Sequence, residues 1–443
     1  MSKLAINGSA PIVGDVKTQP WPPIVQEDID AVVEVLKSGV LWGPTEKEVT
    51  GLQEDIKDYI GAKYALVVNS GTAAIHACVN AVGVEAGDEV IMPAYTFWAT
   101  AQAVLAQNGI PIFIDIEPET YSMDPDLIEE KISEKTKAVM PVHVHGLTCD
   151  MDRINAVAKK HDLRVIEDAA QAFGAEYKGR KAGRLGDMAA VSLNGSKNVP
   201  AGEGGVVLTD DEKLYENARS MSMFGEDKYE KGTIRLYDAK RMGFNYRNNE
   251  LCDAFCRSFL KRFDDLQRQR TELAEYLNKE LVKIKGVKPL PIPEGYKTTY
   301  HLYKVSLYPE ALGIDNVHPK RFRWAVQKAL AAEGLELFEW HNMPVPSQTV
   351  FLSKQVYGKG CPWNCPHARE EVRDIVYDPF DYPNTVDMFD RSFVIKPVYP
   401  PNTFELMERY VEGFQKVFEN LDEVIEFSKT ITFPIMPGEN RNI

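Results

Sequence analysis

The chain has 443 residues, of which 44% are hydrophobic and 26% charged, so it holds enough apolar material for a large globular core. Its 51 Lys and Arg against 65 Asp and Glu give a net charge of −14, which argues against nucleic acid and anionic membranes as partners because both need concentrated positive charge. Six cysteines, no apolar run of membrane-spanning length and no signal-like start predict a cytoplasmic protein.

Short β-branched runs alternate with helical segments up to about residue 265. The strand-like runs are 65–68, 89–92, 112–114, 138–142, 164–166 and 189–193. The first two are followed by helical patterns over 71–82 and 99–108. This alternation predicts an α/β fold with a mainly parallel sheet flanked by helices. Such sheets bind ligands at the carboxyl ends of their strands.

A long helical pattern over 248–281 leads out of this region. Beyond it, a strand-like run over 303–307 and a helical pattern over 319–333 predict a smaller α+β domain, and residues 341–402 are expected to be rich in loops. We therefore expect a large domain of residues 1–265, which includes an N-terminal arm, and a small C-terminal domain of residues 266–443.

The segment Asn69-Ser70-Gly71-Thr72 lies between a predicted strand and a predicted helix. Gly71 lets the backbone approach a ligand closely, the helix N-terminus offers free N–H groups, and Ser70 or Thr72 can donate a hydroxyl hydrogen bond. These features favour a phosphate-binding turn. An ordinary helix N-cap is the alternative, because Ser and Thr commonly provide one.

Two carboxylates, Glu167 and Asp168, lie at the end of the predicted strand over 164–166 and point to opposite faces. A carboxylate beside a bound pyridine ring would keep the ring nitrogen protonated; a helix N-cap and a metal pair are the alternatives. Lys197 follows the strand run over 189–193 and precedes a glycine-rich turn. A neutral lysine amine there can form a Schiff base with an aldehyde, although most lysines are solvated surface groups.

Three motifs in this order resemble the DegT/DnrJ/EryC1/StrS family of fold-type I aminotransferases, which use pyridoxal 5′-phosphate (PLP). The motifs are Ser70-Gly71-Thr72, Glu167-Asp168-Ala169-Ala170-Gln171-Ala172, and Ser192-x4-Lys197-x4-Gly202-Glu203-Gly204-Gly205. Further similar segments are Pro93 to Thr100, Pro141 to Gly146 and Gly243 to Arg247. The likeness covers residues 20–280 well and the C-terminal third loosely.

The resemblance implies a role for each matched residue. Lys197 would carry the cofactor as a Schiff base and move the substrate proton, and Asp168 would pair with the pyridine nitrogen. Gln171 would contact the phenolic oxygen of the ring and Phe97 would stack on its face. Asn245 would reach the phosphate of a neighbouring subunit, so the active site would need a homodimer. The expected cofactor-binding residues are Ser70, Gly71, Thr72, Phe97, Asp168, Gln171, Ser192, Lys197 and Asn245.

The resemblance implies transfer of an amino group from glutamate or glutamine to a keto-sugar or keto-cyclitol in aminosugar or secondary-metabolite biosynthesis. Two alternatives remain: PLP chemistry without net transamination, as in 3-amino-5-hydroxybenzoate synthase, and a non-catalytic regulatory partner. Gln19 to Pro23 resembles the aminocyclitol branch more than the nucleotide-sugar branch.

The segment over 360–369 looks like an insertion near the acceptor side of the small domain. It contains Cys361, Cys365 and His367. No second ligand pair accompanies them, so we expect a loop packed by Trp363, or an incidental thiol pair, and no metal site. His143, His145 and His301 are expected mainly as packing or loop histidines, although His145 could line the pocket.

Overall fold

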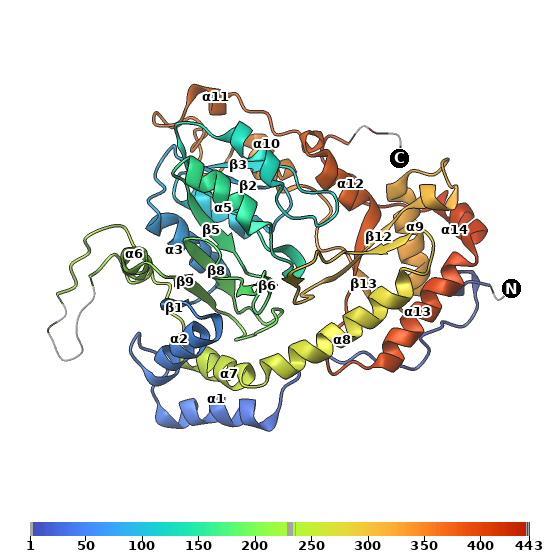
Figure 1. Cartoon of the computed structure of the whole chain (residues 1–443), viewed down its shortest axis with the longest axis horizontal. Coiled ribbons are helices and arrows are strands. Elements are labelled where there is room, and N and C mark those ends of the chain that lie inside the picture. Colours follow the sequence, from blue (N-terminus) through green and yellow to red (C-terminus); the bar gives the residue numbers. More distant parts are fainter. Residues whose placement is uncertain (1–2, 228–233, 235, 440, 442) are drawn as a thin grey trace.

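A seven-stranded sheet forms the centre of the larger part of the molecule (Figure 1). The computed structural model describes residues 3–227, 234, 236–439, 441 and 443. In spatial order the strands are β1 (Tyr64–Val68), β9 (Gly205–Thr209), β8 (Met188–Ser192), β5 (Arg164–Asp168), β4 (Thr136–Val139), β2 (Glu89–Pro93) and β3 (Ile110–Ile114). Strands β8, β5, β4, β2 and β3 are parallel, and β9 runs antiparallel to both β1 and β8. The predicted mainly parallel sheet is confirmed.

Both faces of this sheet are covered by helices. On β1, Leu66 and Val68 pack into the core on one face, whereas Ala65 and Val67 pack into the core on the other. Because both faces of the sheet are buried, successive residues of each strand are apolar. The helices of the larger part are α1 (Gln26–Ser38), α2 (Lys47–Ile60), α3 (Gly71–Ala81), α4 (Trp98–Ala106), α5 (Met151–Lys160), α6 (Glu212–Ser222) and α7 (Glu250–Leu260).

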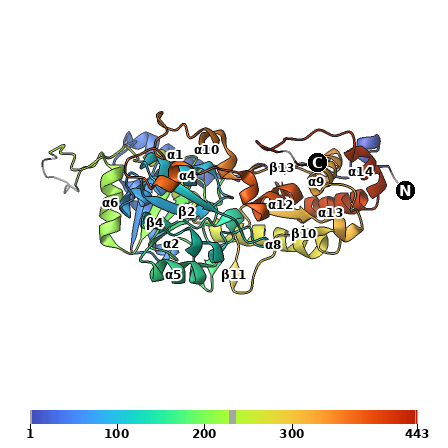
Figure 2. The same cartoon turned by 90° about the horizontal axis from the view of Figure 1, so that it is seen from above.

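A four-stranded antiparallel sheet forms the smaller part, which lies beside the larger one along the long axis (Figure 2). Its strands, in spatial order, are β10 (Val287–Pro289), β12 (Tyr303–Leu307), β14 (Ser392–Ile395) and β13 (Leu337–Phe338). Its helices are α8 (Phe263–Leu281), α9 (Pro319–Ala332), α12 (Pro383–Arg391), α13 (Phe404–Phe418) and α14 (Leu421–Ser428). The remaining elements are β6 (Glu176–Tyr177), β7 (Arg180–Lys181), β11 (Tyr296–Lys297), α10 (Thr349–Ser353) and α11 (Glu370–Arg373).

Two predicted boundaries differ from the structure. The helical pattern over 248–281 forms two helices, α7 and α8, that meet at residues 261–262. Residues 383–395, expected among loops, form α12 and then β14, an inner strand of the small sheet. Their apolar residues are short runs between prolines, so neither a strand nor a helical period was evident in the sequence.

The apolar cores of the larger and the smaller part are not built from two separate stretches of the chain. Leu4 and Val13, near the N-terminus, pack into the core of the smaller part with Phe414. In the other direction, Phe351 and Tyr377 pack into the core of the large sheet. The division into domains at residue 265 therefore stays a prediction, and the packing shows that segments from both ends cross it.

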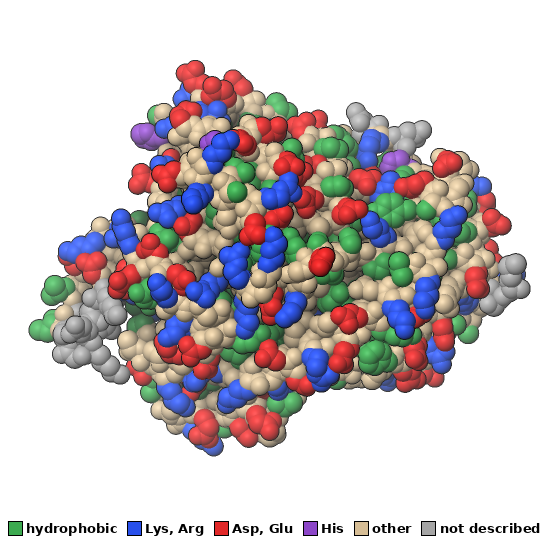
Figure 3. All heavy atoms as spheres, in the orientation of Figure 1, with side chains coloured by type: hydrophobic (Ala, Val, Ile, Leu, Met, Phe, Trp, Pro, Cys, Tyr) green, Lys and Arg blue, Asp and Glu red, His purple; other side chains and the backbone are tan. Residues whose placement is uncertain are grey.

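The surface carries charges of both signs. Figure 3 shows Lys and Arg interspersed with Asp and Glu over the face it presents. Among the described residues, no helix is long and apolar enough to cross a lipid bilayer.

The segment over 360–369 lies against the large sheet, not against the small domain as expected from the sequence. Trp363 is fully buried and donates a hydrogen bond from Nε1 to the hydroxyl of Tyr377 at 2.8 Å. Arg369 forms an ion pair of 2.7 Å with Glu89, the first residue of β2. The expectation of a loop packed around Trp363 is confirmed, and its place in the molecule is corrected. The contact with Glu89 spans 280 residues of sequence, which no local pattern reveals.

Replacing Trp363 with alanine should lower the free energy of unfolding by about 3–5 kcal/mol, because it removes a buried indole and leaves a cavity. Urea denaturation followed by circular dichroism measures this change. Val376→Ala, at a side chain shortly after this segment that is 79% exposed, is the matched control and should change little. Equal midpoints for the two variants would contradict the structural role of Trp363.

Candidate functional site

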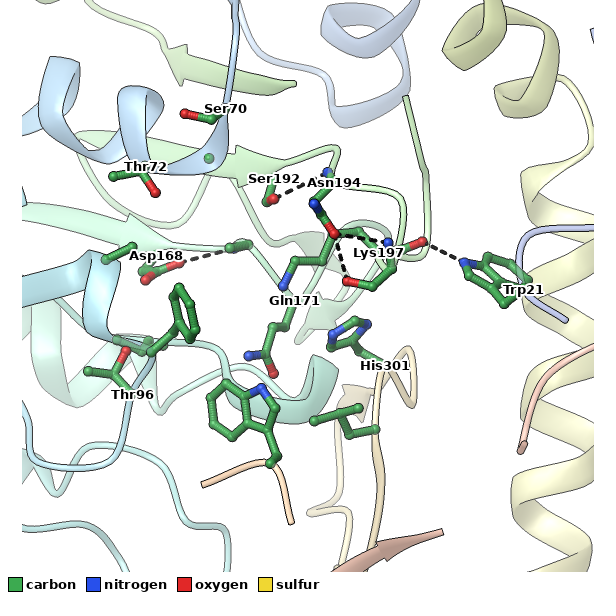
Figure 4. A pocket seen from close by; sticks show the side chains of 18 of the residues that line it. Trp21, Ser70, Thr72, Thr96, Asp168, Gln171, Ser192, Asn194, Lys197 and His301 are labelled. Atoms are coloured by element: carbon green, nitrogen blue, oxygen red, sulfur yellow. Dashed lines mark hydrogen bonds between the residues drawn. The ribbon is translucent and has the colours of Figure 1, made fainter. Parts of the chain in front are cut away.

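A cavity of about 880 Å³ lies at the carboxyl ends of β5 and β8, between the large sheet and the smaller part (Figure 4). Its walls include residues from the N-terminal arm, both sheets and the loops between them. Every residue that the sequence predicted as cofactor-binding lines this cavity, except Asn245: Ser70, Gly71, Thr72, Phe97, Asp168, Gln171, Ser192 and Lys197. The structure therefore brings together residues separated by more than a hundred positions in the sequence.

The N-terminus of α3 forms one end of the cavity. Ser70 is the N-cap and accepts a hydrogen bond from the N–H of Ala73 at 3.1 Å. Among the described residues, the N–H groups of Gly71 and Thr72 have no acceptor. A Cβ at Gly71 would lie 2.7 Å from Cβ of Ser192, so only glycine allows this close approach. Free N–H groups at a helix N-terminus beside two hydroxyl groups form an anion site.

Asp168 ends β5 and is 4% exposed. Thr100 donates a hydrogen bond to its Oδ2 at 2.7 Å, and the N–H of Ala170 donates to its Oδ1 at 3.1 Å. Burial raises the pKa of Asp168, although these two hydrogen bonds and the positive charge of Lys197 oppose the rise. A protonated ring nitrogen would supply the cationic partner that favours the charged carboxylate.

Glu167 points to the other face of β5 and serves the fold. Its two oxygens accept backbone hydrogen bonds from Gly183, Leu185 and Gly186 at 2.5–2.8 Å. Nε2 of His143 lies 3.0 Å from the same carboxylate. The adjacent acids therefore have separate tasks, and His143 is a packing histidine as expected.

Lys197 lies in the turn after β8, and its side chain points into the cavity (Figure 4). The backbone N–H of Lys197 donates to the carbonyl of Asn194 at 2.8 Å, and the carbonyl of Lys197 accepts a hydrogen bond from Nε1 of Trp21 at 3.0 Å. Burial lowers the pKa of the Lys197 ammonium, and the negative charge of Asp168 opposes this shift. A lower pKa increases the fraction of neutral, nucleophilic amine.

Gln171 and Phe97 face the same space. Oε1 of Gln171 accepts the N–H of His145 at 2.8 Å, which leaves its Nε2 available as a donor toward the cavity. Phe97 is 53% exposed, and its ring centroid lies 5.8 Å from that of His341. His145 itself is buried and bonds to the hydroxyl of Tyr95 at 2.8 Å, so it does not line this cavity.

Asn245 lies outside the cavity formed by its own chain. Its side chain is exposed, and its Oδ1 accepts a hydrogen bond from Nε of Arg247 at 2.9 Å. Its backbone pairs with Met223. The projecting segment between them, of which residues 224–227, 234 and 236–244 are described, extends from the body of the molecule (Figure 1). The predicted contact with a neighbouring subunit stays a prediction.

Several residues of the cavity, and the buried Thr100 that bonds to Asp168, were not predicted as site residues from the sequence. Thr100 was part of a matched motif, but nothing local marked it as the partner of Asp168. Trp21, Arg270 and His301 come from the N-terminal arm, α8 and the segment before β12, and Lys396 and Tyr399 follow β14. Their positions depend on long-range packing, so no short motif identifies them.

No group of three metal-ligating side chains occurs among the described residues. Cys361 and Cys365 are free thiols on the segment packed against the large sheet.

Comparison with known proteins gives a consistent result. The model of the DegT/DnrJ/EryC1/StrS aminotransferase family matches residues 22–380. A Streptoalloteichus tenebrarius protein, named provisionally as an L-glutamine:3-amino-2,3-dideoxy-scyllo-inosose aminotransferase, is 35% identical over 340 residues, 76% of this chain and 79% of its own. UDP-2-acetamido-2-deoxy-3-oxo-D-glucuronate aminotransferase of Pseudomonas aeruginosa is 35% identical over 327 residues, 73% of this chain and 84% of its own.

Solved structures agree with the sequence relatives. The crystal structure of 3-amino-5-hydroxybenzoic acid synthase superposes with a TM-score of 0.79 at 25% identity, covering 93% of this chain and 100% of that chain. The chain therefore belongs to the DegT/DnrJ/EryC1/StrS aminotransferase family, whose cofactor is pyridoxal 5′-phosphate.

Proposed function

We propose that this aminotransferase moves an amino group from glutamate or glutamine to a keto-sugar or keto-cyclitol, with its cofactor held on Lys197. The observation that carries the proposal is the joint placement of Lys197, Asp168 and the open N-terminus of α3 in one cavity. A lysine nucleophile, a buried acid and an anion site are the three groups that PLP chemistry requires of a protein.

The residues present fit the cofactor. Gly71 keeps the N-terminus of α3 open, where Thr72 and Ser192 offer hydroxyl groups to a phosphate. Asp168 is buried with no cation hydrogen-bonded to it among the described residues, so a pyridinium N–H suits it. Gln171 offers its Nε2 as a donor to the phenolic oxygen, and the exposed ring of Phe97 is available for stacking.

Each of these residues has a task in amino transfer. Bound PLP supplies an aldehyde and an electron-withdrawing ring. Nζ of Lys197 would hold the cofactor and, as a neutral amine, would take up the proton at Cα of the donor and later give it back. Asp168 would keep the ring nitrogen protonated, and the free N–H and hydroxyl groups at the N-terminus of α3 would hold the phosphate in place.

The relatives support the two substrate classes. One is named for L-glutamine and an amino-scyllo-inosose, and the other for a UDP-linked keto-sugar acid. A cavity of about 880 Å³ has room for a sugar or cyclitol ring beside the cofactor. The similarity to 3-amino-5-hydroxybenzoic acid synthase favours an aromatising reaction as the second candidate.

Absorption spectra separate the candidates. Glutamate or glutamine should convert the purified yellow enzyme to the amine form of the cofactor, and keto-sugars or keto-cyclitols should then restore the original spectrum. If neither amino acid changed the spectrum, transamination with these donors would be excluded. An aromatic product without consumption of a donor would favour the second candidate.

We also propose that the enzyme is a cytoplasmic homodimer with shared active sites. Val40, Leu41 and Trp42 form an exposed apolar strip, and the projecting segment adds Leu236 and Met242 at 81% and 73% exposure. Exposed apolar patches of this kind favour an interface, and a second copy is the partner that would carry Asn245 to a neighbouring cavity.

Mixing two inactive variants tests the shared site. Lys197→Ala and Asn245→Asp should each be nearly inactive, the second because a carboxylate repels the cofactor phosphate. When the variants are refolded together, each mixed dimer contains one site with both wild-type residues. About a quarter of wild-type activity should return, because half of a statistical mixture is mixed dimers with one good site each. If Asn245 served only its own chain, no activity would return.

A further inference from the structure

Asn198 directly follows Lys197 and fixes the geometry of one wall of the cavity. Its Nδ2 donates to the carbonyl of Thr299 at 3.0 Å and to Oε1 of Gln267 at 3.2 Å. A backbone carbonyl can only accept, so the orientation of the Asn198 amide is determined. Its Oδ1 must therefore face donors.

Two side chains meet this oxygen. Nη1 of Arg270 donates to Oδ1 of Asn198 at 3.2 Å, and Nδ1 of His301 lies 2.9 Å from the same atom. Because Oδ1 only accepts, Nδ1 of His301 carries the hydrogen. Burial and the positive charges of Lys197 and Arg270 lower the pKa of His301 well below its usual range. The imidazole is therefore neutral, and its Nε2 is an acceptor.

That acceptor forms no hydrogen bond with any of the described residues. His301 is only partly buried and lines the same cavity as Lys197 and Gln171 (Figure 4). An acceptor on a cavity wall selects a ligand that brings a hydrogen. Carboxylates and ketones bring none, whereas hydroxyl groups do.

We propose that His301 is a substrate-recognition residue whose Nε2 accepts a hydrogen bond from a hydroxyl group of the keto acceptor. The inference rests on the proposed amino transfer to a sugar or cyclitol and adds a residue that selects hydroxylated ketones. Nε2 of His301 would contact the keto acceptor, while its Nδ1–H donates to the side chain of Asn198, the residue that follows Lys197.

Two substitutions separate recognition from support of the fold. His301→Asn can keep the donor toward Asn198 but loses the acceptor in the cavity. His301→Gln can place its Oε1 near the position of Nε2 but loses the bond to Asn198. The probe is scyllo-inosose, a six-membered ring ketone with a hydroxyl on each other carbon, compared with its analogue that lacks the hydroxyl beside the ketone.

The enzyme is first converted to the amine form of its cofactor with glutamate. The keto acceptor is then added, and absorption measures the return of the aldehyde form. We expect His301→Asn to lower kcat/KM for scyllo-inosose at least about tenfold, mainly through KM, and His301→Gln to retain more of it. The analogue that lacks the hydroxyl should not distinguish His301→Asn from the wild type. The glutamate half-reaction should be unchanged in both variants.

The opposite ranking of the two variants would overturn the proposal, because support of Asn198 would then be the role of His301. An equal loss in the glutamate half-reaction would also overturn it, since it would place His301 in proton transfer common to both halves. A second measurement, the ¹⁵N spectrum of the His301 imidazole in the PLP-loaded enzyme at neutral pH, can be made without a keto substrate. We expect a neutral ring with its proton on Nδ1. A proton on Nε2 would refute the assignment. Failure of scyllo-inosose with the wild type, while this spectrum holds, would count against the proposed cyclitol substrate and not against the state of His301.

Discussion

Lys197→Ala should abolish amino transfer while the protein stays folded. The side chain is expected to act both as the nucleophile that holds the cofactor and as the group that moves the substrate proton, and it is the lysine whose positive charge acts on Asp168. A loss of at least about 10³-fold in the rate of the glutamate half-reaction follows. Stopped-flow absorption of the purified variant measures this rate.

The control is Lys213→Ala, at an exposed lysine in the first turn of α6. It should leave the spectrum and the rate unchanged, because it removes a solvated charge far from the cavity. Lys197→Ala should also lose the absorption of the lysine-bound cofactor yet keep the circular dichroism of the wild type. Near-normal turnover in Lys197→Ala would show that the lysine has been assigned the wrong role.

Asp168→Asn should lower kcat by about 10²-fold or more, with a much smaller change in stability. A neutral amide cannot hold a proton on the ring nitrogen, so the ring withdraws electrons less strongly when the donor proton leaves. The lost charge-assisted contact is buried, and a few kcal/mol of transition-state stabilisation corresponds to this factor. A kcat within about threefold of wild type, measured at saturating donor, would rule out this role.

Glu167→Gln is the internal comparison, because the two carboxylates are neighbours on one strand. Glu167 accepts three backbone hydrogen bonds on the face away from the cavity. Its substitution should therefore lower the midpoint of urea denaturation while the kcat of the folded fraction changes little. The pair of variants separates an acid that serves the fold from one that serves the reaction.

Local motifs were sufficient for the parts of the site that lie directly at strand ends. Asp168 and Lys197 each follow a β-branched run, and Ser70 and Gly71 begin a helix, so period and turn chemistry placed them on one edge of the sheet. The antiparallel strand β9 was missed, because its valines follow the glycines of the lysine motif and read as part of that turn.

The remaining wall of the cavity could not be predicted in this way. Trp21, Arg270 and His301 meet Lys197 or Asn198 across separations of roughly seventy to 180 residues, which only tertiary packing determines. The same holds for Thr100, whose hydroxyl reaches Asp168 from the neighbouring α4. The sequence thus predicted where the cofactor chemistry lies, whereas the surfaces that choose a substrate required the structure.

The packing of Leu4 and Val13 with Phe414 has a consequence for biosynthesis. During translation the first residues to leave the ribosome must wait for α9 and then α13, roughly three to four hundred residues later, before their apolar side chains find all their partners. The large sheet also lacks Phe351 and Trp363 until late in synthesis. Since contacts of such long range form slowly and leave apolar surface exposed meanwhile, nascent chains should bind chaperones until the last helices emerge.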